Sequence, residues 1–267
     1  MDKIVLFVPC YNCEKQITRV IKQLETNNHF EYFYEIMIID NGSSDGTIDS
    51  AINMVRASKI NNIRVVKNSQ NVGLGGTHKL AFRHAIKINA SHIAVLHGDD
   101  QGQINDLVNI LENQEHNEYD CCLGSRFDPQ SKLAGYSKFR IFGNYVFNVI
   151  FSVAAGKKIT DLGSGLNIYK VSAINDKKIE MFSNDLTFNC YMVLYSINKN
   201  HSMKFFPITW REDDQISNVK LFSQAKKTLK IAKEYFFRKE KGLVCKNNVI
   251  DFDSIYFIEK YSGEKYD

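Results

Sequence analysis

The chain has 267 residues, of which 44% are hydrophobic and 12% aromatic, and this composition excludes a disordered chain or a fibrous repeat. Its net charge of +4 and its pI near 8.6 suit an anionic ligand or an anionic membrane surface. No basic stretch is interleaved with stacking aromatics, so we expect no nucleic acid partner.

The N-terminal residues predict a buried strand rather than a signal peptide. No apolar run reaches the roughly 18 residues that would cross a bilayer. We therefore expect a cytoplasmic protein, or one bound peripherally to the cytoplasmic face of the membrane. Cys10 and Cys13 form a C-x-x-C pair, but no second pair completes a zinc site. A small buried residue at a strand end is the simpler interpretation of Cys10.

The first half of the chain alternates buried strands with amphipathic helices. The apolar runs predict strands at Ile4–Pro9, Glu35–Asp40, Ile63–Lys67, His92–His97 and Tyr119–Ser125. Uninterrupted apolar strands separated by helices predict an α/β fold with a Rossmann-like, mainly parallel sheet flanked by helices. Ligands bind such sheets at the carboxyl ends of the strands, so the residues that follow each strand are candidates for the site.

The second half is less regular and contains two notable helical segments. Ile141–Ala155 is rich in Phe, Val and Ile, which predicts either a buried helix or a helix lying against lipid. Val219–Lys241 carries eight Lys or Arg residues against two Glu residues. Its apolar residues recur at helical spacing and predict a basic amphipathic helix, either packed on the core or lying on a membrane surface. These residues are Phe222, Ala225, Leu229, Ala232 and Phe236.

The segment that runs from Asp40 to Thr47 follows the second predicted strand and reads Asp-Asn-Gly-Ser-Ser-Asp-Gly-Thr. Gly42 and Gly46 permit tight backbone turns, and Asp45 can satisfy free amides at the start of the next helix. A carboxylate at a strand tip can accept hydrogen bonds from a base or a ribose. Taken alone, the segment is equally compatible with a well-capped turn.

Three further segments follow the other strands: Val8–Asn12 with Glu14, Asn71–Gly76, and His97–Gln101. In this order and at roughly this spacing, the four segments together resemble the pattern of glycosyltransferase family 2. The resemblance covers residues 1–126 and implies a GT-A fold with a nucleotide-diphosphate sugar lying across the strand tips. The glycines at 73–76 follow the third strand rather than the first, which argues against the dinucleotide-binding Rossmann motif.

The resemblance implies a role in donor binding for six of these residues. The nucleotide would be framed by Pro9, Tyr11 and Glu14, and Asp40 would contact the base. Asn71 and Gly73 would let the backbone approach the nucleotide and its diphosphate.

The segment His97–Gln101 departs from the usual D-x-D of that family, because His97 stands at the position of the first Asp and Asp99 at the second. Mg²⁺ or Mn²⁺ prefers carboxylate and phosphate oxygens, so Asp99 is the best candidate ligand, with Gln101 beside it. Asp100 could replace or assist Asp99. His97 either binds the metal, which would favour Mn²⁺, or contacts only the diphosphate.

Further motifs resemble the polyprenyl-phosphate sugar synthases of the same family, among them Gly124–Arg126 and Asp161–Leu166. Arg126 and Arg140 are either phosphate ligands or surface arginines. Arg211 and Lys220 would close over the diphosphate as part of a lid. Asp185 lies where a general base would be, with Asn184 in place of its usual acidic neighbour.

The resemblance thus implies an inverting, metal-dependent transferase that moves a sugar from a UDP- or GDP-linked donor. Two acceptors stay open: a polyprenyl phosphate at the membrane surface, or a hydroxyl of a growing cell-surface glycan such as lipopolysaccharide or capsule. We expect residues 1–218 to form the GT-A domain, with a donor half at 1–126 and an acceptor half at 127–218. A basic amphipathic helix and tail would follow at 219–267. Peripheral membrane contact is expected, and the sequence is compatible with a homo-oligomer.

Overall fold

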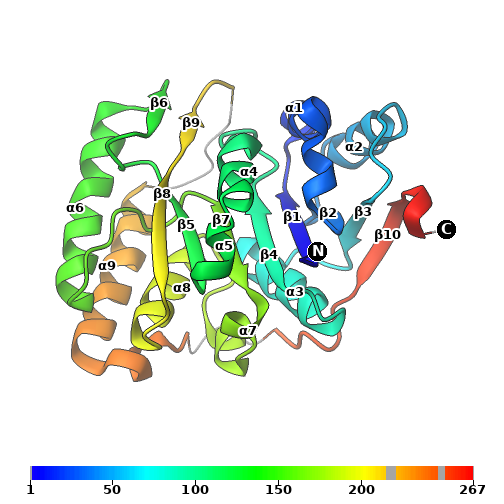
Figure 1. Cartoon of the computed structure of the whole chain (residues 1–267). Coiled ribbons are helices and arrows are strands. Elements are labelled where there is room, and N and C mark those ends of the chain that lie inside the picture. The colour runs from blue at the N-terminus through cyan, green and yellow to red at the C-terminus, as the bar shows by residue number, and fades with distance from the viewer. Residues whose placement is uncertain (1, 215–220, 246–249, 267) are drawn as a thin grey trace.

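The computed structural model describes residues 2–214, 221–245 and 250–266. Its centre is an eight-stranded sheet with the strand order β10-β3-β2-β1-β4-β7-β5-β8. Helices cover both faces of the sheet, as Figure 1 shows. The predicted α/β fold with a mainly parallel sheet is confirmed.

Four neighbouring strands of the sheet pair in parallel: β1 (Ile4–Cys10), β2 (Glu35–Asp40), β3 (Ile63–Asn68) and β4 (His92–Leu96). Every residue of β1, β2 and β4 is buried, as expected for strands that are covered on both faces. In the register of β1 with β2, Cys10 lies opposite Asp40. The loops that follow these two strands therefore start side by side.

The chain beyond β4 extends the same sheet with strands of mixed direction. Strand β7 (Leu166–Lys170) runs antiparallel between β4 and β5 (Cys121–Ser125), and β8 (Met203–Pro207) pairs parallel with β5 at the edge. At the opposite edge, β10 (Phe257–Ser262) pairs antiparallel with β3. A separate parallel pair joins β6 (Lys132–Ala134) to β9 (Thr209–Arg211).

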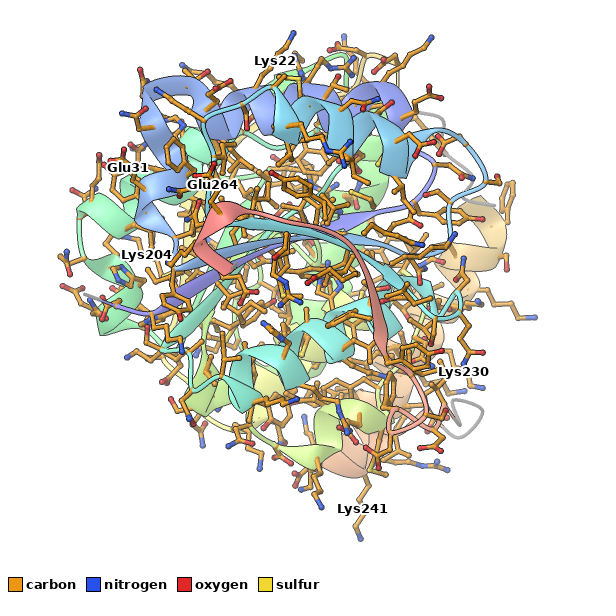
Figure 2. All side chains as sticks on the ribbon, turned by 90° about the vertical axis from the view of Figure 1, so that its right-hand side faces the viewer. Lys22, Glu31, Lys204, Lys230, Lys241 and Glu264 are labelled. Carbon is orange, nitrogen blue, oxygen red and sulfur yellow. The ribbon has the colours of Figure 1, made fainter. Side chains whose placement is uncertain are left out.

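Two helical layers enclose two hydrophobic clusters. One cluster packs Ile17 and Leu107 of α1 (Glu14–Glu25) and α4 (Ile104–Glu112) against the sheet, with α2 (Thr47–Arg56) alongside. The other packs Phe82 of α3 (Gly73–Lys87) and Phe188 of α8 (Phe188–Asn198). Figure 2 shows the sheet nearly edge-on, with α1 and α2 above it and α3 below it. Short helical turns complete the layers: η1 (Thr26–Tyr32), α5 (Glu115–Glu118), α7 (Val171–Ile174), η2 (Lys177–Met181), η3 (Lys239–Leu243) and η4 (Glu264–Tyr266).

Helix α6 (Lys138–Ala155) contains the predicted apolar segment but is not a buried helix. Only Asn148, Phe151 and Ala154 are buried, whereas Phe139 and Val153 are 76% and 67% exposed. The buried-helix interpretation is therefore wrong for most of this helix. The physical reason is its position, because α6 lies at one end of the molecule and packs on α9 (Leu221–Arg238) (Figure 1).

Helix α9 forms where a basic amphipathic helix was predicted, but the face that packs on the core shares only Ala232 with the predicted apolar face. Its buried side consists of Thr228, Ile231, Ala232 and Tyr235. Phe222, Leu229 and Phe236, which the sequence placed on its apolar face, are 94%, 45% and 49% exposed. Across the described ranges, no helix is both long and apolar enough to cross a membrane.

Candidate active site

The loops after β1 and β2 are tied together by side-chain hydrogen bonds. The Asn12 amide donates to Ser43 Oγ (2.9 Å), and the Ser44 amide donates to the Asn12 side-chain oxygen (2.9 Å). Asp45 accepts from the amides of Thr47 (3.1 Å) and Glu14 (3.2 Å), so it helps to start α2, as predicted, and α1 as well. These bonds build a rigid rim at the strand tips, from which the predicted donor residue Tyr11 projects with 51% exposure.

Glycine lets the loop after β4 approach the end of β1. The Gly98 amide donates to the carbonyl oxygen of Pro9 (3.0 Å). A Cβ at position 98 would lie 2.4 Å from Cys10 Sγ. The structure thus brings Pro9 and the His97–Gln101 segment together, as the sequence predicted for a shared donor site.

Asp40 is buried, and its carboxylate turns into its own loop. It accepts hydrogen bonds from the amides of Gly42 (3.1 Å) and Ser43 (3.1 Å). Gly42 has φ of +83°, a conformation that glycine adopts without strain. In this structure the carboxylate stabilises the turn. The predicted contact with a base would therefore involve other groups of this loop, because the Asp40 carboxylate is already hydrogen-bonded.

Asn41 links the β2 loop to the β3 loop, a role that the sequence analysis missed. Its side-chain nitrogen donates to Asn71 Oδ1 (3.0 Å), and its oxygen accepts from the Val72 amide (2.9 Å). The adjacent Gly73 has φ of +74°. The predicted donor residue Asn71 is therefore held in place by its neighbour across the sheet.

The glycines at the start of α3 approach the backbone of the segment around Asn184. The Gly75 amide donates to the carbonyl oxygen of Asn184 (2.8 Å), and a Cβ at Gly73 would lie 2.3 Å from the same oxygen. Gly73 was predicted to let the backbone approach the diphosphate. In the structure it fixes the segment that carries Asp185.

Lys79 holds the same segment and was also missed. Its buried ammonium donates to the carbonyl oxygen of Phe182 (2.5 Å) and to Asn184 Oδ1 (2.7 Å). Burial lowers the pKa of Lys79 to about 8. A Lys inside a helix at the end of an apolar stripe gives no sequence signal that distinguishes it from a surface Lys.

His97 and Asp99, two of the predicted metal ligands, directly follow β4. Burial lowers the pKa of His97 to about 4, and burial raises the pKa of Asp99 to about 6. His97 Nε2 is buried and has no hydrogen-bond partner among the described residues. Gln101, the third predicted ligand, donates through its side chain to Glu212 (3.4 Å).

These residues fit a divalent cation. A cation next to Asp99 would stabilise the charged carboxylate, which burial disfavours. The imidazole of His97 is neutral at this pKa, so its buried Nε2 could bind the metal. Among the described residues no cluster of three His, Cys, Asp or Glu side chains stands ready to bind an ion. Such a cation would therefore need oxygen ligands from a diphosphate or from water, as Mg²⁺ and Mn²⁺ commonly take.

Asp100 does not share the environment of Asp99. It is fully buried, with φ of +61°, and forms an ion pair with Arg19 (2.5 Å) and another with Arg211. Arg211, predicted to close over the diphosphate, thus lies against Asp100 in this structure. Its predicted companion Lys220 lies outside the described residues.

Arg126 and Arg140 are both paired with carboxylates. Arg126 donates through two nitrogens to Asp161, at 2.8 Å each, and Arg140 pairs with Glu212 (2.6 Å). Although burial opposes it, Asp161 raises the pKa of Arg126. The Gly124–Arg126 and Asp161–Leu166 motifs, separated in sequence, therefore meet in one ion pair.

Asp185 lies just before α8, as expected for a base position, but its carboxylate already accepts several hydrogen bonds. It accepts from Ser183 Oγ (2.8 Å), Thr187 Oγ1 (2.6 Å) and Lys227 Nζ (2.9 Å). Although burial alone would raise it, the hydrogen bonds from Thr187 and Lys227 lower the pKa of Asp185 to about 2. A carboxylate with so low a pKa is a weak proton acceptor at neutral pH.

Comparison with known families and proteins identifies the relatives of this chain. The family model described as Glycosyl transferase family 2 matches residues 5–177. A UDP-N-acetylglucosamine–dolichyl-phosphate N-acetylglucosaminyltransferase of Methanococcus voltae is 26% identical over 184 residues, covering 65% of this chain and 72% of its own length. A dodecaprenyl-phosphate galacturonate synthase of Rhizobium johnstonii is 24% identical over 178 residues, covering 66% of this chain and 50% of its own length. The chain thus spans between half and three quarters of these two relatives.

Solved structures share the fold. The glucosyl-3-phosphoglycerate synthase of Mycobacterium tuberculosis, in complex with Mn²⁺, UDP-glucose and phosphoglyceric acid, superimposes with a TM-score of 0.65 at 11% identity, covering 99% of this chain and 91% of that one. TarS 1-349 of S. aureus gives a TM-score of 0.53 at 18% identity, covering 90% of this chain and 69% of that one. The predicted GT-A fold is confirmed.

Proposed function

Since the chain belongs to glycosyltransferase family 2, we propose that it transfers a sugar from a nucleotide-diphosphate sugar to a polyprenyl phosphate at a membrane surface. The donor would lie across the tips of β1, β2 and β4. The rim formed by the Asn12 and Ser43 loops would receive the nucleotide, with Tyr11 at its edge.

In this proposal Asp99 and His97 would hold a divalent cation together with the donor diphosphate. The cation would neutralise the charge that develops on the leaving nucleoside diphosphate. The ion pair between Asp100 and Arg19 fixes the loop that also carries Asp99. Such preorganised electrostatic stabilisation is usually the largest contribution to catalysis.

The transfer itself would be a direct displacement at the anomeric carbon with inversion. An oxygen of the acceptor phosphate forms the new bond to this carbon, and the bond to the donor diphosphate breaks, with its electron pair leaving on the nucleoside diphosphate. A phosphate acceptor is already anionic, so no proton needs to be removed. The low pKa of Asp185, which makes it a weak base, agrees with such an acceptor.

The observation that carries the choice of acceptor is the exposed apolar stripe of α6. Phe139, Phe142, Val146, Val149 and Val153 follow one another at helical spacing and are 40–76% exposed. Soluble proteins rarely expose a contiguous apolar surface of this kind without a partner. Beside it lies the basic helix α9, which itself exposes Phe236 and Phe237 (Figure 1). A surface that is apolar with basic flanks suits an anionic bilayer, where a lipid-linked acceptor would be found.

The proposal is tested by identifying the product. The protein is incubated with radiolabelled UDP- and GDP-sugars, Mn²⁺ and a short polyprenyl phosphate such as farnesyl phosphate. We expect an organic-soluble product that mild acid cleaves to release the sugar, as a glycosyl phosphate does. A product that resists mild acid and forms only with a glycan acceptor would contradict the proposal and favour the hydroxyl of a surface glycan.

A further inference from the structure

One buried carboxylate holds two arginines that come from distant parts of the chain. Asp100 is fully buried in the loop after β4. Arg19 of α1 donates through Nε to Asp100 Oδ2 (2.5 Å), and Arg211 of β9 donates through Nη2 to the same oxygen. Gln23 Nε2 donates to the other oxygen, Oδ1 (2.6 Å). A single negative charge is therefore shared by two guanidinium groups.

Arg19 is the more firmly anchored of the two arginines. Its two terminal nitrogens also donate to both carboxylate oxygens of Asp214 (2.7 and 3.2 Å). On the same face of α1, one turn later, Gln23 is fixed as well, because its side-chain oxygen accepts from the Ile104 amide (2.9 Å). Arg19 and Gln23 together form a fixed pair of partners for Asp100.

Arg211 is the partner whose departure the site tolerates. Its side chain is 32% exposed, and its Nε donates to the Asp100 carbonyl oxygen (3.0 Å). If this guanidinium moves away, Asp100 still has Arg19 and Gln23. Without Arg19, the same movement would leave a fully buried carboxylate without a cation among the described residues, which is strongly unfavourable.

The backbone of Arg211 is fixed beside the loop that carries the predicted metal ligand. The Arg211 amide donates to the carbonyl oxygen of Gln101 (3.0 Å). Asp99 lies two residues before Gln101 in this loop. A phosphate held by a cation at Asp99 would therefore lie near the base of the Arg211 side chain. Guanidinium groups bind phosphate strongly, through two parallel hydrogen bonds.

The charges favour an exchange of partners when an anion arrives. Two guanidinium groups on one carboxylate oxygen repel each other, and this repulsion is strong where water is excluded. A nucleoside diphosphate would give one of them a carboxylate-free partner of higher charge. Arg19 is held by a second carboxylate, whereas Arg211 has only the more distant Asp213 (3.8 Å) besides Asp100.

We propose that Arg19 is a positioning residue: it keeps Asp100 neutralised, so that Arg211 can leave Asp100 and bind the terminal phosphate of the nucleoside diphosphate. The inference rests on the proposed function, of which it uses only the nucleotide donor. Arg19 itself stays on Asp100 and Asp214 and does not touch the donor. The exchange makes and breaks no covalent bond.

The first test measures nucleotide binding by calorimetry, with Mn²⁺ and the full chain. Arg19→Gln should weaken the binding of UDP or GDP about tenfold or more, because Arg211 is then retained by Asp100. The binding of UMP or GMP, which lacks the terminal phosphate, should change less than about twofold. An equal loss for the monophosphate would show a general structural role of Arg19 and overturn the inference.

Arg83→Gln is the matched control. Arg83 is also a helical arginine that pairs with two carboxylates, those of Glu180 and Asp253, but it belongs to α3. This variant should bind UDP or GDP within about twofold of the original chain. If it weakened the diphosphate as much as Arg19→Gln does, the effect would not belong to Asp100.

A double-mutant cycle tests whether Arg19 acts through Arg211. If it does, Arg19→Gln/Arg211→Gln binds the diphosphate within about twofold of Arg211→Gln alone. Independent contributions would multiply, and such an outcome would overturn the inference. Arg19→Lys keeps the cation and should bind the diphosphate more tightly than Arg19→Gln does. A lysine variant as weak as the glutamine variant would contradict the role of charge.

Failure of the inference and failure of the proposed function give different results. If the diphosphate binds and the effects of Arg19→Gln and Arg211→Gln multiply, the inference is wrong and the proposed donor stands. If the cycle shows the expected coupling but no polyprenyl phosphate accepts sugar, the proposed acceptor is wrong and the role of Arg19 stands. If neither UDP nor GDP binds the original chain with Mn²⁺, the donor site itself is wrong, and the inference falls with it.

Discussion

Asp99 and Asp100 are neighbours in the chain with opposite environments. Burial raises the pKa of Asp99, whereas Asp100 is fully buried and paired with Arg19 and Arg211. Asp100 also has φ of +61°, in the left-handed region. The paired Asp100 carboxylate therefore fixes the loop that carries Asp99, the predicted metal ligand.

This division predicts different effects of the two amide substitutions. Asp100→Asn should lower the free energy of unfolding by about 1–3 kcal/mol, because it leaves two half-exposed arginines without their buried partner. Asp99→Asn should destabilise the protein less than Asp100→Asn in the absence of metal, because burial already disfavours the charged form of Asp99. Urea denaturation of both variants measures this, and equal destabilisation would contradict the assignment.

Lys79 makes stability depend on pH in a specific window. Burial lowers its pKa from the ordinary value of 10.5 to about 8. The unfolded chain therefore keeps this proton to a higher pH than the folded chain, so the contribution of Lys79 to stability increases from about pH 8 to about pH 10.5.

The variant Lys79→Met cannot titrate at this position and should lack that increase. We expect the difference in free energy of unfolding between the original chain and the variant to shift by about 2 kcal/mol between pH 7 and pH 10. Urea denaturation at several pH values supplies the two curves. Curves that stay parallel over this range would show that the ammonium is not desolvated as described.

At the scale of elements, the contact of α3 with the Asn184 segment joins two segments that lie far apart in the sequence. Gly73→Ala would force a Cβ to within 2.3 Å of the Asn184 carbonyl oxygen, at a residue with φ of +74°. We expect a loss of about 1–3 kcal/mol of stability and a higher KM for the acceptor.

Gly143 in α6 offers a matched control for that substitution. A Cβ there would meet nothing within 4 Å, and the residue lies inside a helix. Gly143→Ala should therefore stabilise the protein by about 0.5–1 kcal/mol. Thermal melts compare the two variants, and a Gly73→Ala variant as stable as Gly143→Ala would contradict the packing described for α3.

The stripe on α6 predicts a membrane contact. Phe142→Ser/Val149→Ser should weaken binding to anionic phospholipid vesicles about tenfold or more, because it removes two exposed apolar side chains that would enter the bilayer. Tyr256→Ser, at an equally exposed residue far along the chain, serves as the control. Vesicle flotation measures the change. If Phe142→Ser/Val149→Ser binds vesicles as well as the original chain does, but is a monomer where the original chain is a dimer, the stripe is a self-association surface.

For the whole molecule, the sequence predicted the parallel part of the sheet because β1, β2 and β4 are continuous apolar runs. Strand β10 escaped prediction because it is an edge strand without any fully buried residue. Its place is set by pairing with β3, almost two hundred residues earlier in the chain. The position of an edge strand such as β10 depends on contacts with residues far away in the sequence, and a local sequence pattern does not show these contacts.

In the candidate active site, too, contacts between distant residues could not be predicted from local sequence patterns. The motifs predicted which loops meet, since parallel strands end at one edge of the sheet. They did not predict the partners of the charged residues. Arg211 with Asp100, Arg126 with Asp161 and Lys227 with Asp185 are pairs separated by 111, 35 and 42 positions. Each pair forms because the fold brings two segments together, so the charge available to a ligand becomes visible only in three dimensions.

The most direct test of the donor site is a thermal-shift panel of UDP- and GDP-sugars, with and without Mn²⁺, on the original chain and on Asp99→Asn. A ligand that binds only the folded protein stabilises it by about 2.7 kcal/mol at a hundredfold excess over its dissociation constant. We predict that one nucleotide sugar raises the melting temperature only when Mn²⁺ is present, and that Asp99→Asn abolishes this shift. A shift that needs no metal, or that persists in Asp99→Asn, would contradict the metal-dependent donor site at the tips of β1, β2 and β4.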